Sequence, residues 1–520
     1  MKKIISIVLV VLMAMTVMAV PAKRDGVVRI AADGSEKTVY VHGNEFFHYL
    51  TDAEGNWLDE ETLLPMSEEV KNARIAVSQS ESSQAKARRA KEETGTSRLL
   101  APRGAVILVS YSDKAFSSTN EEMKEWAMGD DYMHNGATGS IHQYFLDQSW
   151  GEYDLQIDVF GPVVLSKELA YYGSNNSQGD DKHVDELVKE ACTLAHDSCG
   201  ADFSLYDFDN NGKVDWVVII YAGYGEASGA PAETVWPHQY DLSYIGKSFY
   251  LDGKKVDHYC CLNELTGTRG TKRDGIGTFC HEFSHVMGLP DLYATNDATH
   301  HTLCEWDVMD YGAYNNNGNT PPCYSAYERW FMGWITPRVL TEPEFVTLQT
   351  LNESKESLLM CEGDAHNLDG LNPNPKNFYL IENRVKEGWD KYLPGEGMLL
   401  TKINYSYYKW SMNIVNNTKS SMGVDLIEAK ANTTSGFSAK GKATDAFPDG
   451  ASEYTEFEGH EITDIDWVIG SNTIQFSYRG AEPQGIDDIE DGKTAKKIIR
   501  DGQVLIIRDG KTYDVLGNRL

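Results

Sequence analysis

The stretch CHEFSHVMGLPDLY, residues 280–293, holds side chains that together could bind a metal ion. His281 and His285 are four residues apart, which places both on one face of an α-helix, so both ring nitrogens can reach one ion. Glu282 follows His281 and can reach a water molecule at that ion. A catalytic zinc ion takes three protein ligands and keeps its fourth position for water. The stretch therefore predicts a catalytic zinc site with one ligand still to be found, the alternative being a surface helix with incidental histidines.

Asp291 is the first candidate for the third ligand. Gly288 comes one turn after His285, where a left-handed residue can end the helix, and Pro290 prevents the helix from continuing. Asp291 follows at once, and a carboxylate oxygen is an acceptable zinc ligand. A loop could instead bring back one of three other side chains, which stay open as alternatives: His300, His301 and Glu305.

Strands and helices that alternate up to residue 340 are predicted to position this site. RGAVILVSYSD, residues 103–113, and WVVIIYAGYG, residues 216–225, are apolar runs that suit buried strands. DDKHVDELVKEACTLAHD, residues 180–197, carries apolar residues at helical spacing. This alternation predicts a mixed α/β domain.

Short strands take over from about residue 345 to residue 480. Turns rich in Gly, Asn and Pro separate runs such as NFYLIENR, GMLLTKINYS and NTIQFSYRG. That pattern is typical of a β-sandwich.

The N-terminal stretch MKKIISIVLVVLMAMTVMAVPA, residues 1–22, is predicted to be a secretory signal peptide. It has a basic start, an apolar run that is short for a bilayer span, and small residues at two cleavage points, after Ala19 or after Ala22. The alternative is an uncleaved membrane anchor. No later segment approaches the length of a transmembrane helix, so no membrane span is expected after signal removal.

Residues 23–100 are predicted to be a propeptide. Strand-like runs, KTVYVHG and EFFHYLTDAEGNWL, come first, and a turn-forming DAEGN breaks the second. Residues 78–97, SQSESSQAKARRAKEETGTS, are polar and lack aromatic residues, which predicts a flexible segment that a protease can cut. An ordinary interdomain linker is the alternative.

The last stretch, residues 495–520, follows an acidic spacer, GIDDIEDGK, and predicts two or three short strands with Asp-Gly turns at 501–502 and 509–510.

At 520 residues the chain is too long for one hydrophobic core. The predicted divisions are a signal peptide (1–22), a propeptide (23–100), a catalytic domain (101–342), a β-rich domain (343–482) and a spacer with a C-terminal tail (483–520).

Several motifs resemble known metalloproteases. HEFSHVMGLPD resembles the elongated zinc signature of the metzincins, with Asp in place of their commoner third His. EWDVMDYG, residues 305–312, resembles their Met-turn, which implies that Met309 lies in an apolar floor beneath the zinc. More narrowly, segments in a shared order over roughly residues 100–405 resemble the M6 peptidases, the immune inhibitor A family: 140–156, 207–229, 236–242, 325–335 and 377–400.

The resemblance implies a secreted zinc endopeptidase with an N-terminal propeptide, an α/β (α+β) metzincin-like catalytic domain and a β-sandwich-like domain after it. Zinc would activate a water molecule and polarise the scissile carbonyl, and Glu282 would be the general base. Tyr311 matches a tyrosine that some metzincins use to hydrogen-bond the tetrahedral intermediate; a packed core tyrosine is the alternative. LLTKIN, residues 399–404, departs from the family's more His/Asp-like strand ending, which puts a functional role for that strand in doubt.

DFDNNGKVD, residues 207–215, matches the start of an EF-hand calcium loop, with Gly212 at position 6. Position 12 is Val218 instead of the bidentate Glu, so the match is incomplete. The alternative is an Asx-rich turn leading into the next strand. The predicted calcium (Ca2+) ligands are Asp207, Asp209, Asn211, Lys213 and Asp215.

Eight cysteines, all between Cys192 and Cys361, fit export to an oxidising space. The local pairs Cys192–Cys199 and Cys304–Cys323 are the first disulfides to expect. No cysteine precedes residue 190, so a propeptide thiol cannot cap the zinc. Latency would then need a carboxylate, a histidine such as His42 or His48, or steric cover.

The resemblance implies protein or peptide substrates as partners. Nucleic acids are not expected as partners, because the net charge of −31 repels their phosphates. The C-terminal tail resembles the sorting segments of type IX secretion. This resemblance implies that a secretion machinery exports the protein to an extracellular or cell-surface location in a Gram-negative bacterium. The alternative is an edge hairpin.

Two other functions stay open: a non-catalytic, peptidase-like extracellular binding or adhesion protein, and a zinc amidase acting on cell-wall or small peptides.

Overall fold

The computed structural model has a mixed α/β architecture with several separate sheets. The predicted linker, residues 78–97, and the acidic spacer lie outside the described residues, as does the predicted signal peptide except for residues 20–22. In the described part of the chain, no helix combines the length and the apolar character needed to cross a membrane. The structure describes residues 20–31, 34–44, 47–60, 62–75, 100–176, 181–296, 300–434, 440–482, 495–500, 503–508, 511–513 and 520.

A five-stranded sheet with the order β6-β5-β7-β11-β8 forms the centre of the part that carries the zinc motif. Four of its strands run parallel, and β8 is antiparallel to β11. The strands are β5 (Arg103–Ser110), β6 (Gln156–Val164), β7 (Val217–Tyr224), β8 (His238–Asp241) and β11 (His258–Leu265).

Successive residues of the inner strands point into two different cores. In β5, Val106 and Leu108 join a core with three helices, whereas Ile107 and Val109 join a core with α5 on the opposite face. Because helices cover both faces, β7 and residues 104–109 of β5 are apolar throughout, and the strands predicted at 103–113 and 216–225 are confirmed. The helices are α2 (Asn120–Met128), α3 (Ile141–Gln148) and α6 (Gly277–Val286) on one face and α5 (Val184–Cys199) on the other.

Helix α6 carries the zinc motif, and every one of its residues is buried. Gly277 is required at its start, because a Cβ there would lie 1.9 Å from the carbonyl oxygen of Ala313. Gly288 follows the helix with a φ of 106°, so it turns the chain as predicted.

Two sheets after residue 335 share one core. The first has the order β12-β14-β15-β16-β17 and the second the order β13-β19-β18, and apolar residues of both form one buried cluster. The switch from helices to short strands is therefore confirmed. The strands are β12 (Arg338–Val339), β13 (Glu344–Leu348), β14 (Leu358–Met360), β15 (Asn377–Arg384), β16 (Gly397–Asn404), β17 (Val424–Leu426), β18 (Ile462–Trp467) and β19 (Ile474–Tyr478).

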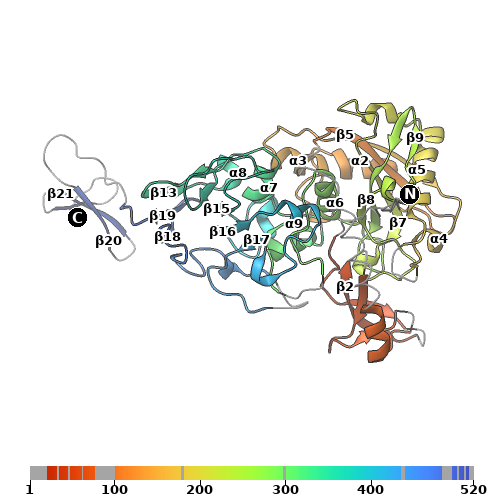
Figure 1. The fold of residues 1–520 in the computed structure, drawn as a ribbon, viewed down its shortest axis with the longest axis horizontal. Helices are drawn as coiled ribbons and strands as arrows, with labels where there is room; N and C mark the ends of the chain where they lie inside the picture. Colours follow the sequence, from red (N-terminus) through yellow and green to blue (C-terminus); the bar gives the residue numbers. More distant parts are fainter. Residues whose placement is uncertain are drawn as a thin grey trace, which may run out of the picture.

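Two smaller sheets lie outside these cores (Figure 1). The N-terminal sheet is an antiparallel meander that packs on the part with the zinc motif through Trp236 and Ala227. The C-terminal strands form an antiparallel sheet of three strands at one end of the molecule, in agreement with the short strands predicted for the tail. The strands are β1 (Val27–Ile30), β2 (Glu36–Asn44), β3 (Phe47–Thr51), β4 (Trp57–Leu58), β20 (Ala495–Arg500), β21 (Gln503–Arg508) and β22 (Lys511–Tyr513).

All eight cysteines are free, so the two expected local disulfides are absent from the structure. Cys192 and Cys199 both lie in α5, seven residues apart. At about 1.5 Å per residue their Cα atoms are roughly 10 Å apart, beyond the reach of a disulfide. Seven of the thiols are buried, and only Cys199 is exposed.

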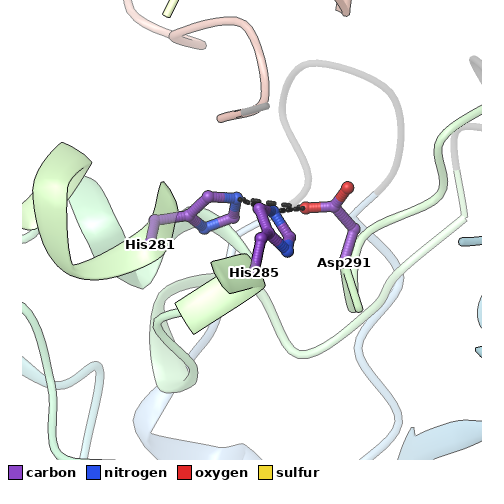
Figure 2. A group of neighbouring side chains, drawn as sticks. All are labelled: His281, His285 and Asp291. Atoms are coloured by element: carbon purple, nitrogen blue, oxygen red, sulfur yellow. Dashed lines mark hydrogen bonds and ion pairs between the residues drawn. The ribbon is translucent and has the colours of Figure 1, made fainter. Parts of the chain in front are cut away.

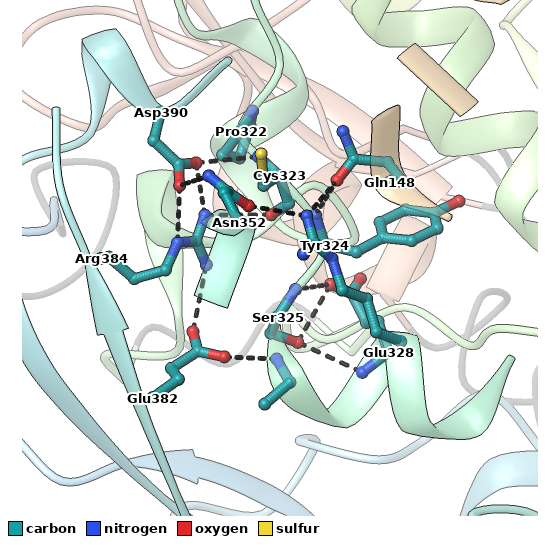
Figure 3. Close-up of polar contacts among 12 residues, drawn as sticks. Gln148, Pro322, Cys323, Tyr324, Ser325, Glu328, Asn352, Glu382, Arg384 and Asp390 are labelled. Carbon is teal, nitrogen blue, oxygen red and sulfur yellow. Dashed lines mark hydrogen bonds and ion pairs between the residues drawn. The ribbon is translucent and has the colours of Figure 1, made fainter. Parts of the chain in front are cut away.

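A buried polar network joins the part that carries the zinc motif to the β-rich part (Figure 3). Arg384 of β15 donates through Nε to Asp390 at 2.8 Å and through Nη1 to Glu382 at 3.1 Å. It also donates to the carbonyl oxygen of Cys323 at 3.0 Å, and Cys323 N donates to Asp390 at 2.9 Å. The next residue, Tyr324, shares a hydrogen bond between its hydroxyl and that of Ser284 in α6. The network therefore ties the helix of the zinc motif to strand β15.

Replacing Arg384 with Met should lower the free energy of unfolding by about 3–5 kcal/mol, because it leaves buried carboxylates without their cation. The matched control is Arg338→Met, which breaks a half-exposed pair with Glu344 and should cost about 0–1 kcal/mol. Chemical denaturation followed by tryptophan fluorescence measures both. Equal losses for the two variants would contradict a structural role for the network.

Candidate metal centre

Three side chains converge at the end of α6 (Figure 2). Nε2 of His281 lies 3.1 Å from Nε2 of His285 and 3.1 Å from Oδ1 of Asp291, and Nε2 of His285 lies 3.2 Å from the same oxygen. All three residues are buried. The structure therefore brings together the two predicted histidines and the first candidate for the third ligand.

The hydrogen bonds of the two histidines determine which nitrogen carries the proton. Nδ1 of His281 lies 2.8 Å from the carbonyl oxygen of Val308, and Nδ1 of His285 lies 2.8 Å from that of Leu289. A carbonyl only accepts, so each Nδ1 is the donor, and in a neutral ring Nε2 then carries a lone pair. Burial lowers the pKa of His285, which favours its neutral form.

Three lone pairs thus face one another across about 3 Å in a buried space, an arrangement that a cation would satisfy. Ligands at about 2.0–2.1 Å in a tetrahedral site are roughly 3.3 Å apart, close to the observed separations. The residues fit a metal ion.

Asn413 holds Asp291 in place from the β-rich part. Its Nδ2 donates to Oδ2 of Asp291 at 2.5 Å, and its Oδ1 accepts from the backbone nitrogen of Asp291 at 2.7 Å. Sequence reasoning missed this residue, although the Asn-rich stretch NIVNN, residues 413–417, could have pointed to it. It follows strand β16 through helix α9 (Tyr407–Ser411), so the strand whose role was in doubt leads to a contact of the candidate ligand.

The stretch that resembles a Met-turn runs beneath the centre. Val308 supplies the carbonyl that orients His281, and the carbonyl of the fully buried Met309 accepts from the backbone nitrogen of Leu292 at 2.8 Å. Tyr311 lies to one side, with its ring centroid 6.3 Å from that of Tyr293, which in turn lies 6.5 Å from His281. Tyr293 thus lies next to both rings, and Tyr311 is not one of the three clustered side chains.

The alternative third ligands lie elsewhere. His300 contacts the carbonyl oxygen of Asn416, and His301 pairs with Glu428 at 2.9 Å. Glu305 accepts from the backbone nitrogen of Gly441 at 2.7 Å. None of the three joins the cluster, which leaves Asp291 as the candidate.

Among the described residues a second group also has metal-ligand spacing, made of His48, Glu60 and Glu226. Here His48 already pairs with Glu226 at 2.9 Å, and Arg74 pairs with Glu60 at 3.0 Å. Each carboxylate therefore already has a cationic partner, His48 for Glu226 and Arg74 for Glu60.

The predicted calcium loop uses its side chains for internal bonds. Asp207 accepts from two backbone nitrogens and from Nζ of Lys254 at 2.6 Å, and Asp209 accepts from Asn211. Asn211 accepts in turn from the backbone nitrogen of Lys213, and Asp215 accepts from that of Phe208. This hydrogen bonding is that of an Asx-rich turn, and the Lys254 ammonium supplies the positive charge next to Asp207. Calcium binding stays a prediction from the sequence alone.

Comparison with known proteins agrees with the motifs. The family model for the immune inhibitor A peptidase M6 catalytic domain matches residues 109–335. Residues 109–335 are thus similar to the catalytic domain of the M6 peptidases. The matched range includes the His281, His285 and Asp291 cluster, so the metal expected of an M6 metalloprotease has a candidate site here.

Two M6 relatives are similar over part of the chain. The pre-pro-metalloprotease PrtV of Vibrio cholerae is 26% identical over 311 residues, which cover 53% of this chain and 32% of PrtV. Immune inhibitor A of Bacillus thuringiensis subsp. alesti is 29% identical over 218 residues, covering 37% of this chain and 31% of that protein. The similarity thus spans about a third of the length of each curated relative.

Substituting Asn413 with Gly should weaken binding of a divalent metal about 10- to 100-fold, because Asp291 loses both hydrogen bonds that orient it. Glycine retains the left-handed backbone that Asn413 adopts at a φ of 49°. Asn417→Ala, which removes a side chain bonded to Thr295 instead, is the control and should bind normally. Competition for Zn2+ with a chelator of known affinity measures this, and equal affinities for the two variants would remove Asn413 from the site.

Proposed function

We propose that this chain is a secreted, zinc-dependent endopeptidase that hydrolyses peptide bonds of extracellular proteins. The observation that carries the proposal is the buried convergence of His281, His285 and Asp291, with Glu282 one residue along the same helix. The match to the M6 catalytic domain over residues 109–335 supports it.

The proposed chemistry divides between the metal and the chain's own side chains. His281, His285 and Asp291 would hold zinc, which when bound lowers the pKa of a water molecule and polarises the scissile carbonyl. Glu282 would accept a proton from the water as it attacks and would deliver that proton to the leaving amine nitrogen. Its carboxylate is fully buried, which strengthens its electrostatic interactions with the reacting groups.

Tyr311 is proposed to stabilise the tetrahedral intermediate. The hydroxyl would donate a hydrogen bond to the oxygen that becomes negative, a contact made only as the reaction proceeds. Its place beside Tyr293 and the metal centre supports this role.

The flanking parts of the chain are proposed to serve export and latency. Residues 1–22 would direct secretion, residues 23–100 would form a propeptide removed by cleavage within 78–97, and the C-terminal tail would engage a secretion machinery. The N-terminal sheet supports the propeptide assignment, because it packs on the catalytic part through the small cluster that contains Trp236.

Glu282→Gln should abolish proteolysis, lowering kcat for casein by at least about 10²-fold, while zinc content stays at one ion per chain. The neutral amide retains the size of the carboxylate and cannot accept the proton. Glu305→Gln is the matched control and should retain both activity and metal. A chelator should abolish activity and zinc should restore it, measured on protein cleaved within 78–97. Casein hydrolysis that survives Glu282→Gln contradicts the mechanism.

Tyr311→Phe should lower kcat about 10²-fold with little change in KM, because one hydrogen bond to the developing charge is lost. Tyr293→Phe provides the comparison, since this ring lies between Tyr311 and His281 and is given no chemical role. Steady-state kinetics on a peptide substrate separates the two constants. Unchanged turnover in Tyr311→Phe would leave Tyr311 as a packed core residue.

A further inference from the structure

Two buried carboxyl groups face each other beside the stretch that resembles a Met-turn. Asp307 belongs to that stretch, and Glu328 lies in helix α7 (Ala326–Phe331). Both residues are 0% exposed, and their carboxyl groups hydrogen-bond each other. Neither residue has a role in the proposed function.

Each carboxyl group uses only one of its oxygens elsewhere. Oδ1 of Asp307 accepts from the backbone nitrogen of Met309 at 2.8 Å. Oε2 of Glu328 accepts from the backbone nitrogen of Ser325 at 2.7 Å and from its hydroxyl at 3.0 Å (Figure 3). The other two oxygens, Oδ2 of Asp307 and Oε1 of Glu328, are buried and find no donor in the described part of the chain.

One proton between the two groups supplies the missing donor. An ionised carboxylate only accepts hydrogen bonds, so two ionised groups at this distance would repel each other, whereas a protonated group can donate to an ionised one. Burial raises the pKa of Glu328 well above its usual value, and burial also raises the pKa of Asp307. Both directions favour a pair that retains a proton at neutral pH.

The charged groups around the pair do not neutralise a second negative charge. Arg384 lowers the pKa of Asp307 from a distance, but its guanidinium is already bonded to Asp390, and Asp310 acts in the opposite direction. The other titratable groups that face Glu328 are phenols whose pKa burial raises well above the usual value, so they are neutral: Tyr144, Tyr324 and Tyr327.

We propose that Asp307 and Glu328 share one proton, and that the resulting hydrogen bond positions residues 305–312 beneath the metal centre. Both are positioning residues, because they act on the metal ligands through other parts of the chain. The positioning role rests on the proposed zinc site, whereas the shared proton does not.

Two backbone carbonyls carry the effect from Asp307 to the metal centre. The next residue, Val308, accepts through its carbonyl oxygen from Nδ1 of His281 at 2.8 Å. The carbonyl oxygen of Met309 accepts at 2.8 Å from the backbone nitrogen of Leu292, the residue after the third candidate ligand. A shift of Asp307 would therefore disturb one histidine ligand and the backbone beside the carboxylate ligand.

The pH dependence of unfolding tests the shared proton. The folded pair retains a proton that the unfolded chain releases above about pH 4, so the folded chain loses stability as the pH rises. Between about pH 5 and pH 7 the unfolding equilibrium constant of the metal-free full chain should therefore rise about tenfold more per pH unit than that of Glu328→Gln. The glutamine keeps the size of the side chain, and its amide donates to Asp307 without a proton that titrates. Chemical denaturation followed by tryptophan fluorescence measures both.

Two further variants make this result decisive. Asp307→Asn should remove the same pH dependence, because its amide donates to Glu328 in turn. Glu122→Gln is the matched control, because Glu122 makes the same capping-box bonds with Thr119 in α2 but is exposed, and it should retain the wild-type dependence. An equal pH dependence for the wild type and Glu328→Gln would overturn the shared proton.

Zinc affinity tests the positioning role. Each single variant leaves one donor and one acceptor between the two groups, so Asp307→Asn and Glu328→Gln should each bind Zn2+ like the wild type. The double variant places two amide donors face to face, so it should bind Zn2+ about 10- to 100-fold more weakly than either single variant, measured by competition with a chelator. Zinc binding by the double variant that is equal or tighter would overturn the positioning role, because neutral amides would then only relieve repulsion between two ionised groups. Zinc binding by no form at all would contradict the proposed function, and the pH dependence of unfolding would still decide the shared proton.

Discussion

Two imidazole nitrogens and a carboxylate oxygen meet in a buried space, each with a lone pair directed at the other two. The carbonyls of Val308 and Leu289 force this arrangement, because they take up the ring protons on the far side of each histidine. Without a cation the three lone pairs repel one another, whereas a bound cation would be coordinated by all three groups. Other parts of the chain hold these three side chains in position.

That alignment comes from parts of the chain that are distant in sequence. Helix α6 fixes the spacing of the histidines, and Gly288 turns the chain towards Asp291. Asn413, in the β-rich part, holds Asp291 by hydrogen bonds. The buried Arg384 network ties the same helix to strand β15. The β-rich part therefore helps to build the metal centre.

The sequence predicted the local features well and the long-range ones poorly. The buried strands, α5 and the turn at Gly288 follow from apolar patterns and glycine, which act over a few residues. Asn413 was missed, because its role depends on a contact across 122 positions. The disulfide expectation failed because it relied on sequence spacing, whereas α5 holds Cys192 and Cys199 too far apart.

We propose that His281, His285 and Asp291 form one zinc site. A crystal structure of the zinc-loaded protein, with anomalous diffraction measured at the zinc edge, tests this most directly. We expect one strong anomalous peak about 2.0–2.2 Å from Nε2 of both histidines and from Oδ1 of Asp291. A peak coordinated by His300, His301 or Glu305 in place of Asp291, or no zinc at this cluster, would contradict it.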